Sequence, residues 1–125
     1  VLIYSSTVET ATLAHQNGAL VVHHPVRNIA SVRNAGIRAA KHSIVVSIDA
    51  DSQFPADGLL RVWERMQQPD IIGGGFQVYF DARQRWMGPL VRIFQEGVHL
   101  VSGIYGGMFF FDRKVALKIG GFPEN

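Results

Sequence analysis

The sequence has 125 residues, enough for one domain with a hydrophobic core. Hydrophobic residues make up 47% and charged residues 18%, which excludes a disordered chain, and no apolar run reaches the length of about 18 residues that a membrane-spanning helix needs. The net charge of +2 fits an anionic ligand but is too weak to indicate nucleic acid, and the absence of cysteine excludes disulfides and thiolate metal sites.

Apolar runs, capping residues and glycines predict strands that alternate with helices along the chain. The predicted strands cover residues 1–4, 19–24, 43–48, 70–80 and 106–111, and the predicted helices cover 5–17, 29–41, 55–67, 84–102 and 112–119. Pro55 suits the first turn of its helix, and Gly120 and Gly121 close the last helix. The second helix carries one face of small residues, namely Ile29, Val32, Gly36, Ala39 and Ala40. The alternation predicts an α/β fold with a mostly parallel sheet.

Polar residues gather at the carboxyl ends of the strands, which is where parallel sheets bind ligands. Ser5 follows the first strand, and Asp49 and Asp51 follow the third. Arg33 lies in the first turn of its helix, and helix amino ends at the same edge add partial positive charge that suits phosphate. We therefore expect a site for an anionic ligand along this edge.

The stretch IVVSIDADSQF, residues 44–54, places the two acids directly after an apolar strand. If strand geometry continues past Ile48, Asp49 and Asp51 point to the same side. Two neighbouring carboxylates repel each other, so either one takes up a proton or a cation lies between them. Oxygen ligands of this kind suit Mg²⁺ or Mn²⁺. A solvated loop remains the alternative, because an isolated Asp-x-Asp pattern is short and common.

Two longer stretches resemble family 2 glycosyltransferases, which have the GT-A fold. SVRNAGIRAAKHSIVVSIDADS resembles the family's segment from an Arg-Asn-x-Gly helix into an Asp-x-Asp strand, and GGMFFFDRKVALKIGGFPEN resembles its Gly-Gly-Phe-x-Glu segment. The matching residues are Arg33, Asn34, Gly36, Asp49, Asp51, Arg113, Gly120, Gly121, Phe122 and Glu124. The resemblance implies a GT-A-like (Rossmann-like) sheet flanked by helices. It implies that residues 1–125 form a single partial domain, incomplete at both ends.

The resemblance also implies an inverting, metal-dependent enzyme with a nucleotide-diphospho-sugar donor and an unidentified acceptor. Asp51 would bind Mg²⁺ or Mn²⁺ directly, and Asp49 would assist the metal or hold the ribose. Arg33 and Asn34 would contact the donor, although Asn34 reads equally well as a loop-facing or capping amide. Ser5 is a further candidate for a donor contact because of its place at the same edge of the sheet, although relatives commonly carry acids there. The general base of relatives follows the Gly-Gly-Phe-x-Glu segment, so we expect it beyond Asn125 and assign no catalytic residue within this chain.

Other interpretations remain open at this stage. An Asp-x-Asp after a strand also occurs in haloacid-dehalogenase-like phosphatases, where Asp49 would be the nucleophile and Asp51 the general acid. A chain with missing ends could instead be a non-catalytic remnant that binds nucleotide or associates with itself. The helix expected at 84–102 is apolar on two sides, so it would be buried, meet a second copy of the chain, or contact a membrane surface. We expect a cytoplasmic protein, because no signal peptide is visible, with the inner face of a membrane as the alternative.

Overall fold

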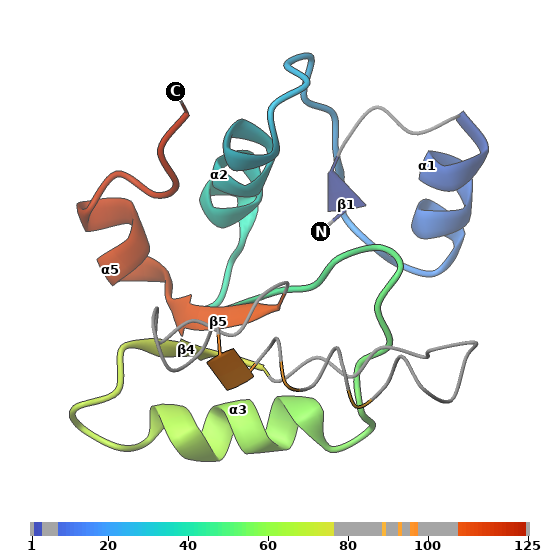
Figure 1. Ribbon diagram of the computed structural model, residues 1–125. Helices are drawn as coiled ribbons and strands as arrows, with labels where there is room; N and C mark the ends of the chain where they lie inside the picture. The colour runs from blue at the N-terminus through green and yellow to red at the C-terminus, as the bar shows by residue number, and fades with distance from the viewer. Residues whose placement is uncertain are drawn as a thin grey trace. The chain divides into compact units, whose positions relative to one another are not determined.

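Helices and strands alternate along most of the chain that the computed structural model describes (Figure 1), which is residues 2–3, 8–76, 89, 93, 96–97 and 108–124. In chain order the elements are β1 (Leu2–Ile3), α1 (Val8–Gln16), β2 (Val21–Val22), α2 (Ile29–Ala39), β3 (Ile44–Ser47), α3 (Gly58–Met66), β4 (Gly73–Gly75), β5 (Phe109–Asp112) and α5 (Arg113–Lys118). The α/β class predicted from the sequence is confirmed.

The chain divides into two units. The first unit joins Val1–Val45 to Phe111–Asn125, and the second unit is Val46–Phe110. The first unit is therefore built from both ends of the chain, and all of α1, α2 and α5 belong to it.

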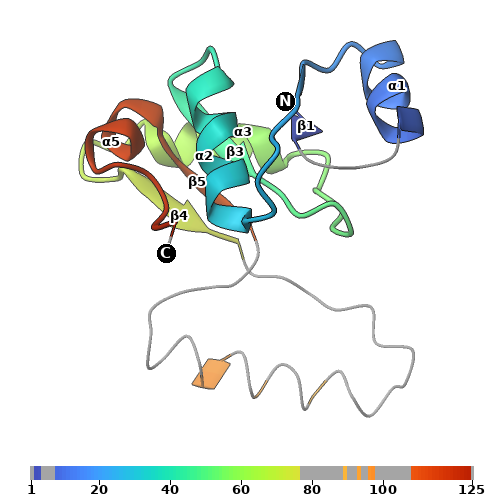
Figure 2. The same ribbon diagram turned by 90° about the horizontal axis from the view of Figure 1, so that it is seen from above.

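In the first unit, α2 lies between α5 and the strand pair β1–β2 (Figures 1 and 2). The two strands are parallel, with Leu2 opposite Val21 and Ile3 opposite Val22. The amino end of α2 is capped by Asn28, whose side-chain oxygen accepts a hydrogen bond of 3.0 Å from the N–H of Ser31. Such a cap explains why the helix begins where the sequence predicts.

The buried face of α2 differs from the predicted small-residue face. Ile29 is 73% exposed, whereas the residues with the least exposure are Ser31, Asn34, Ala35 and Ile37. Two of these four are polar, and the hydrogen bonds described below offset the cost of burying them. The sequence pattern shows which small residues share a face of α2, but it does not reveal that the helix turns a polar pair inward.

Helix α5 begins and ends as the sequence predicts. The Asp112 carboxylate accepts a hydrogen bond of 2.9 Å from the N–H of Val115, and Gly120 and Gly121 follow the helix with φ of 88° and 77°. Its first residue, Arg113, donates from Nε to the Ile37 carbonyl at 2.8 Å. The same guanidinium donates to the Arg38 carbonyl at 2.9 Å. Carbonyl groups in the last turn of an α-helix lack partners within the helix, and Arg113 of α5 supplies donors for two of them in α2.

The three remaining strands form a sheet in the order β3-β5-β4. This small sheet is antiparallel, so among the described strands the prediction of a mostly parallel sheet is met by the β1–β2 pair alone. The alternation rule assigns a parallel direction to strands joined through a helix, as β3 and β4 are joined through α3. This rule does not reveal that β5, which comes later in the chain, lies between β3 and β4.

The core of the second unit is aromatic. The rings of Phe54 and Phe76 meet edge to face with centroids 5.1 Å apart, and those of Phe76 and Phe110 do so at 5.4 Å. Gly74 makes room for this stack, because a Cβ at that position would lie 2.7 Å from Phe110 Cζ. The GGG sequence at residues 73–75 is therefore explained in part by close packing against a ring.

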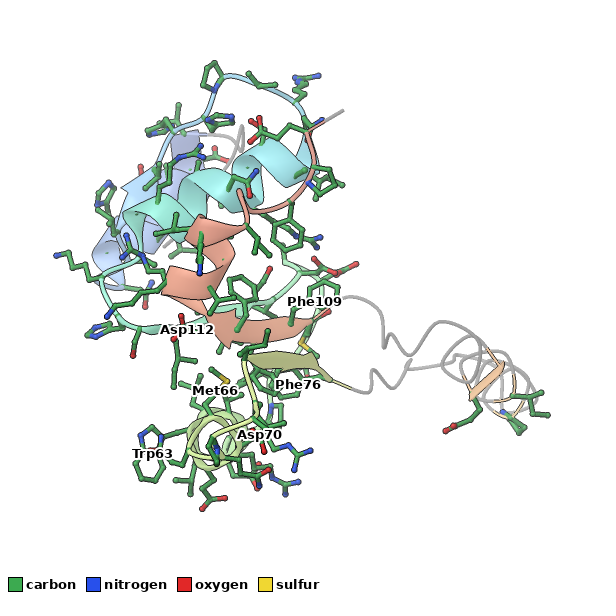
Figure 3. The ribbon with its side chains drawn as sticks, turned by 90° about the vertical axis from the view of Figure 1, so that its left-hand side faces the viewer. Trp63, Met66, Asp70, Phe76, Phe109 and Asp112 are labelled. Atoms are coloured by element: carbon green, nitrogen blue, oxygen red, sulfur yellow. The ribbon has the colours of Figure 1, made fainter. Side chains whose placement is uncertain are left out.

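Helix α3 covers this core with one side of its apolar surface. Val62 is 3% exposed, and Met66 points from the helix toward the strands, whereas Trp63 points away from them and is 55% exposed (Figure 3). The helix begins at Gly58 and not at Pro55, whose carbonyl instead accepts the N–H of Gly58 at 2.9 Å in the preceding turn.

Some predictions fall outside the described residues. Of the helix expected at 84–102 the structure describes only positions 89, 93, 96 and 97, which are helical. The membrane and second-copy interpretations of that segment therefore stay predictions. Within the described residues, no helix has the length and apolarity needed to cross a bilayer.

Candidate functional site

The two acids lie on a tight turn after β3. The strand ends at Ser47, and the carbonyl of Asp49 accepts a hydrogen bond of 3.0 Å from the N–H of Ser52, which closes a turn over residues 49–52. We call these four residues the acid turn. Strand alternation would orient both carboxylates to one side only if the strand continued through them, and this condition is not met because β3 ends at Ser47. Asp49 is half-buried, and Asp51 is exposed.

The acid turn is held at both ends. Before it lies β3, and after it Phe54 anchors the chain by its edge-to-face contact with Phe76 of the second unit's core. Two carboxylates are thus presented on a short loop between two ordered elements. Such a loop keeps the acids near each other without burying either of them completely.

The acid turn fits a divalent cation only in part. Among the described residues, no three His, Asp or Glu side chains come together in a group that could hold a metal ion. Mg²⁺ and Mn²⁺ are commonly bound by one or two carboxylates, with substrate phosphates and water completing the shell. The hard oxygen donors of Asp49 and Asp51 suit that arrangement, and a phosphate-bearing ligand would be needed to complete it.

In the first unit, Arg33 lies over an aromatic ring. Its Cζ is 5.6 Å from the centroid of the Phe122 ring, within the range of a cation–π contact. Phe122 also meets Phe111 edge to face, with centroids 6.2 Å apart. Arg33 is half-buried, so part of this side chain reaches the surface.

The side chain of Asn34 is hydrogen-bonded by the chain itself. Its Nδ2 donates to the Phe122 carbonyl at 2.8 Å and to Glu124 Oε1 at 2.7 Å, and its Oδ1 accepts from the Phe122 N–H at 2.8 Å. Asn34 is 4% exposed. Both N–H groups and the carbonyl oxygen of this amide therefore have partners on the segment that follows α5.

Glu124 is ionised more readily than an ordinary glutamate. The hydrogen bond from the Asn34 amide is the largest cause that lowers its pKa, and a hydrogen bond from Ser31 and the charges of Arg38 and His24 act in the same direction. This carboxylate thus belongs to the polar contacts of α2.

A serine and a histidine also meet on this side of the first unit. His24 Nε2 and Ser31 Oγ are 2.7 Å apart. The pair does not resemble a hydrolytic site, because Ser31 is 5% exposed and the carboxylate of Glu124 interacts with the serine and the amide of Asn34. The contact satisfies the buried hydroxyl of Ser31, which is therefore not presented to solvent as a nucleophile.

The predicted site residues therefore occur in two groups. Arg33 and Asn34 belong to the first unit, whereas Asp49 and Asp51 share the acid turn of the second unit, and Ser5 lies outside the described residues. Sequence reasoning missed the Phe122 ring beneath Arg33. The one signal for it was the occurrence of the Arg-Asn and Gly-Gly-Phe motifs in the same chain.

Comparison with known proteins identifies the family. No curated protein has a sequence that matches this chain. The sequence model described as "Glycosyl transferase family 2" matches residues 5–120, a range that contains the acid turn and the whole of α2 and α5. Because the match covers nearly all of the 125 residues, the chain belongs to glycosyl transferase family 2.

Proposed function

We propose that this protein binds a nucleotide-diphospho-sugar together with Mg²⁺ or Mn²⁺ and transfers the sugar to an acceptor hydroxyl. Family membership supports the general class, a glycosyltransferase-like enzyme with a GT-A fold. The observation that carries the donor part of the proposal is the acid turn, which presents Asp49 and Asp51 directly after β3.

The residues have distinct roles in this proposal. Asp51 is exposed and binds the cation directly, whereas the half-buried Asp49 assists it or accepts a hydrogen bond from the ribose. When bound, a divalent cation neutralises negative charge on a departing nucleoside diphosphate. Arg33 contacts the nucleotide, because a guanidinium can use its face for an aromatic ring and its N–H edges for phosphate oxygens. Ser5 remains a further candidate for a donor contact.

The transfer step is proposed to be direct and inverting. The acceptor oxygen attacks the anomeric carbon as the bond to the diphosphate oxygen breaks, and a carboxylate removes the proton of the hydroxyl. We assign that base to no described residue. Glu124, the acid of the Gly-Gly-Phe-x-Glu segment, is engaged by Asn34.

Titration calorimetry with UDP and with GDP, each with and without Mn²⁺, tests the donor proposal. Because the acid turn offers the cation two carboxylates, we expect Mn²⁺ alone to bind weakly and to bind much more tightly with nucleotide. Asp51→Ala should weaken nucleotide binding in Mn²⁺ by about tenfold or more, and Asp49→Ala should weaken it less. Asp70→Ala is the matched control, because Asp70 is an exposed acid of the same unit outside the acid turn.

Two results would contradict the proposal. One is nucleotide affinity that is unaffected by Mn²⁺ and by Asp51→Ala. The other is hydrolysis of a phosphate ester that survives Asp51→Ala but is lost in Asp49→Ala, since that pattern indicates a nucleophilic Asp49 and a phosphatase.

A further inference from the structure

The amide of Asn34 is fully engaged within the protein, although the residue lies beside the proposed nucleotide contact in the sequence. Two donated hydrogen bonds and one accepted hydrogen bond, all between 2.7 and 2.8 Å, join it to Phe122 and Glu124. An amide with both N–H groups and its oxygen occupied, and with 4% exposure, is unsuited to direct contact with a ligand. A different role is therefore needed for this residue.

The segment that Asn34 holds is shaped to receive it. Gly120 and Gly121 have φ of 88° and 77°, which turns the chain back after α5. A Cβ on Gly121 would lie 2.9 Å from Cγ of Asn34 and closer still to its Oδ1, so only glycine leaves room for the amide. The turn and the amide thus fit each other closely.

The consequence of this fit is the position of the Phe122 ring. Both backbone polar groups of Phe122 are bound to Asn34, so the direction in which its side chain leaves the backbone is set there. That ring lies 5.6 Å from Arg33 Cζ. Arg33 and Asn34 are neighbours on a helix, so their side chains point in different directions. Both nevertheless contact Phe122, because Arg33 lies over its ring and Asn34 binds its backbone.

We propose that Asn34 is a positioning residue for nucleotide recognition, which fixes the turn after α5 so that the Phe122 ring supports the Arg33 guanidinium. This inference rests on the proposed function, in which Arg33 contacts the nucleotide. Asn34 acts through Phe122 and touches no part of the donor. The aromatic support limits the conformations of a long, flexible side chain and lowers the entropy lost when nucleotide binds.

Nucleotide affinity in Mn²⁺, measured for variants of Phe122, tests this inference. Phe122→Leu keeps the backbone hydrogen bonds to Asn34 but removes the ring, and it should weaken binding by about fivefold. Phe122→Tyr keeps the aromatic face and should bind within about twofold of the unmodified protein. Phe110→Leu is the control, because it also replaces a phenylalanine of β5 by leucine, but one whose ring meets Phe76 in the second unit.

A double-mutant cycle separates positioning from a general loss of stability. Asn34→Ala should weaken binding when Arg33 is present and have little further effect in Arg33→Ala, whereas its effect should add to that of Asp51→Ala. Thermal unfolding shows which variants are folded at the temperature of the titration. If Asn34→Ala does not fold, the Phe122→Leu and Arg33→Ala pair supplies the same cycle.

The possible failures can be told apart. If Arg33→Ala weakens binding but Phe122→Leu does not, the positioning inference is overturned and the donor proposal survives. If Phe122→Leu weakens binding equally with and without Arg33, the ring acts independently of Arg33 and the inference is also overturned. If neither Arg33→Ala nor Asp51→Ala changes nucleotide affinity, the proposed function itself fails.

Discussion

The guanidinium of Arg113 donates a hydrogen bond of 2.8 Å from Nε to the carbonyl of Ile37, which lies 76 positions earlier in the chain. A second bond reaches the Arg38 carbonyl, and the backbone N–H of Arg113 donates to the Ser43 carbonyl at 2.7 Å. One residue at the start of α5 therefore completes the end of α2 and holds the chain that leads into β3.

Replacing Arg113 with lysine should destabilise the protein. An ammonium group is a compact donor and cannot reproduce the fork that reaches two successive carbonyls, so we expect a loss of about 1–2 kcal/mol in the free energy of unfolding. Urea denaturation followed by circular dichroism measures this loss. Arg61→Lys is the control, because Arg61 forms an exposed i,i+4 pair with Asp57 and should change stability by less than about 0.5 kcal/mol. Equal effects of the two substitutions would contradict the assigned role of Arg113.

Gly121 and Gly18 form a matched pair for testing the turn that receives Asn34. Both have positive φ, 77° and 75°, so alanine should strain the backbone by about 1 kcal/mol at either position. Among the described residues, no atom lies within 4 Å of a Cβ on Gly18, whereas a Cβ on Gly121 meets the Asn34 amide. We therefore expect Gly121→Ala to cost about 3 kcal/mol and Gly18→Ala about 1 kcal/mol in chemical denaturation. Similar costs would mean that Asn34 moves aside freely.

Stability should depend on the ionisation of Glu124. The hydrogen bond from Asn34 is the main cause that lowers the pKa of this carboxyl in the folded protein. A lowered folded pKa gives stability that is present above the unfolded value, about 4.3, and is lost as pH falls through the folded value. Thermal unfolding from pH 6 to pH 3 should show this loss.

Glu124→Gln isolates this contribution, since glutamine retains an oxygen that can accept from Asn34 but cannot ionise. The difference in unfolding temperature between the unmodified protein and Glu124→Gln should shrink as the pH falls below about 4. Asn34→Ala removes the donor and should diminish the same pH-dependent difference. A difference that stays constant across the pH range would exclude a lowered pKa for Glu124.

The phenylalanine stack makes Gly74 intolerant of a side chain. A Cβ there would lie 2.7 Å from Cζ and 3.0 Å from Cε1 of Phe110, so Gly74→Ala should cost about 1–3 kcal/mol through overpacking. Adding Phe110→Leu should recover part of that cost, because the shorter side chain leaves room for the methyl group. Urea denaturation of both single variants and of the double variant measures the coupling. Additive losses would show that the two positions do not compete for space.

The sequence predicted single helices and strands better than it predicted which of them pack together. The ends of α5 follow from Asp112 as a cap and from the two glycines after Lys118, and these signals lie within a few residues of the helix. Strand β3 was recognisable as a short apolar run for the same reason. The position of β5 between β3 and β4 was not predictable, because strand order depends on contacts between segments far apart in the chain.

The candidate site shows the same limit at the level of single side chains. Asp49 and Asp51 were identified from their place after a strand, but a strand that ends at Ser47 changed the geometry inferred for them. From the sequence, Asn34 could equally be read as a ligand contact or as a capping or loop-facing amide. Only the contact with Phe122, 88 positions away, distinguishes these roles.

The discontinuity of the first unit has a consequence for folding. Residues 1–45 and 111–125 belong to one unit, so α2 cannot obtain its contacts with Arg113 or Phe122 until residues 111–125 have left the ribosome. Bringing these segments together closes a long loop, and the entropy lost in closing it slows the step. Any order that residues 46–110 acquire beforehand shortens the effective loop. During synthesis, α2 is therefore made early but obtains its contacts with α5 and the segment after it late.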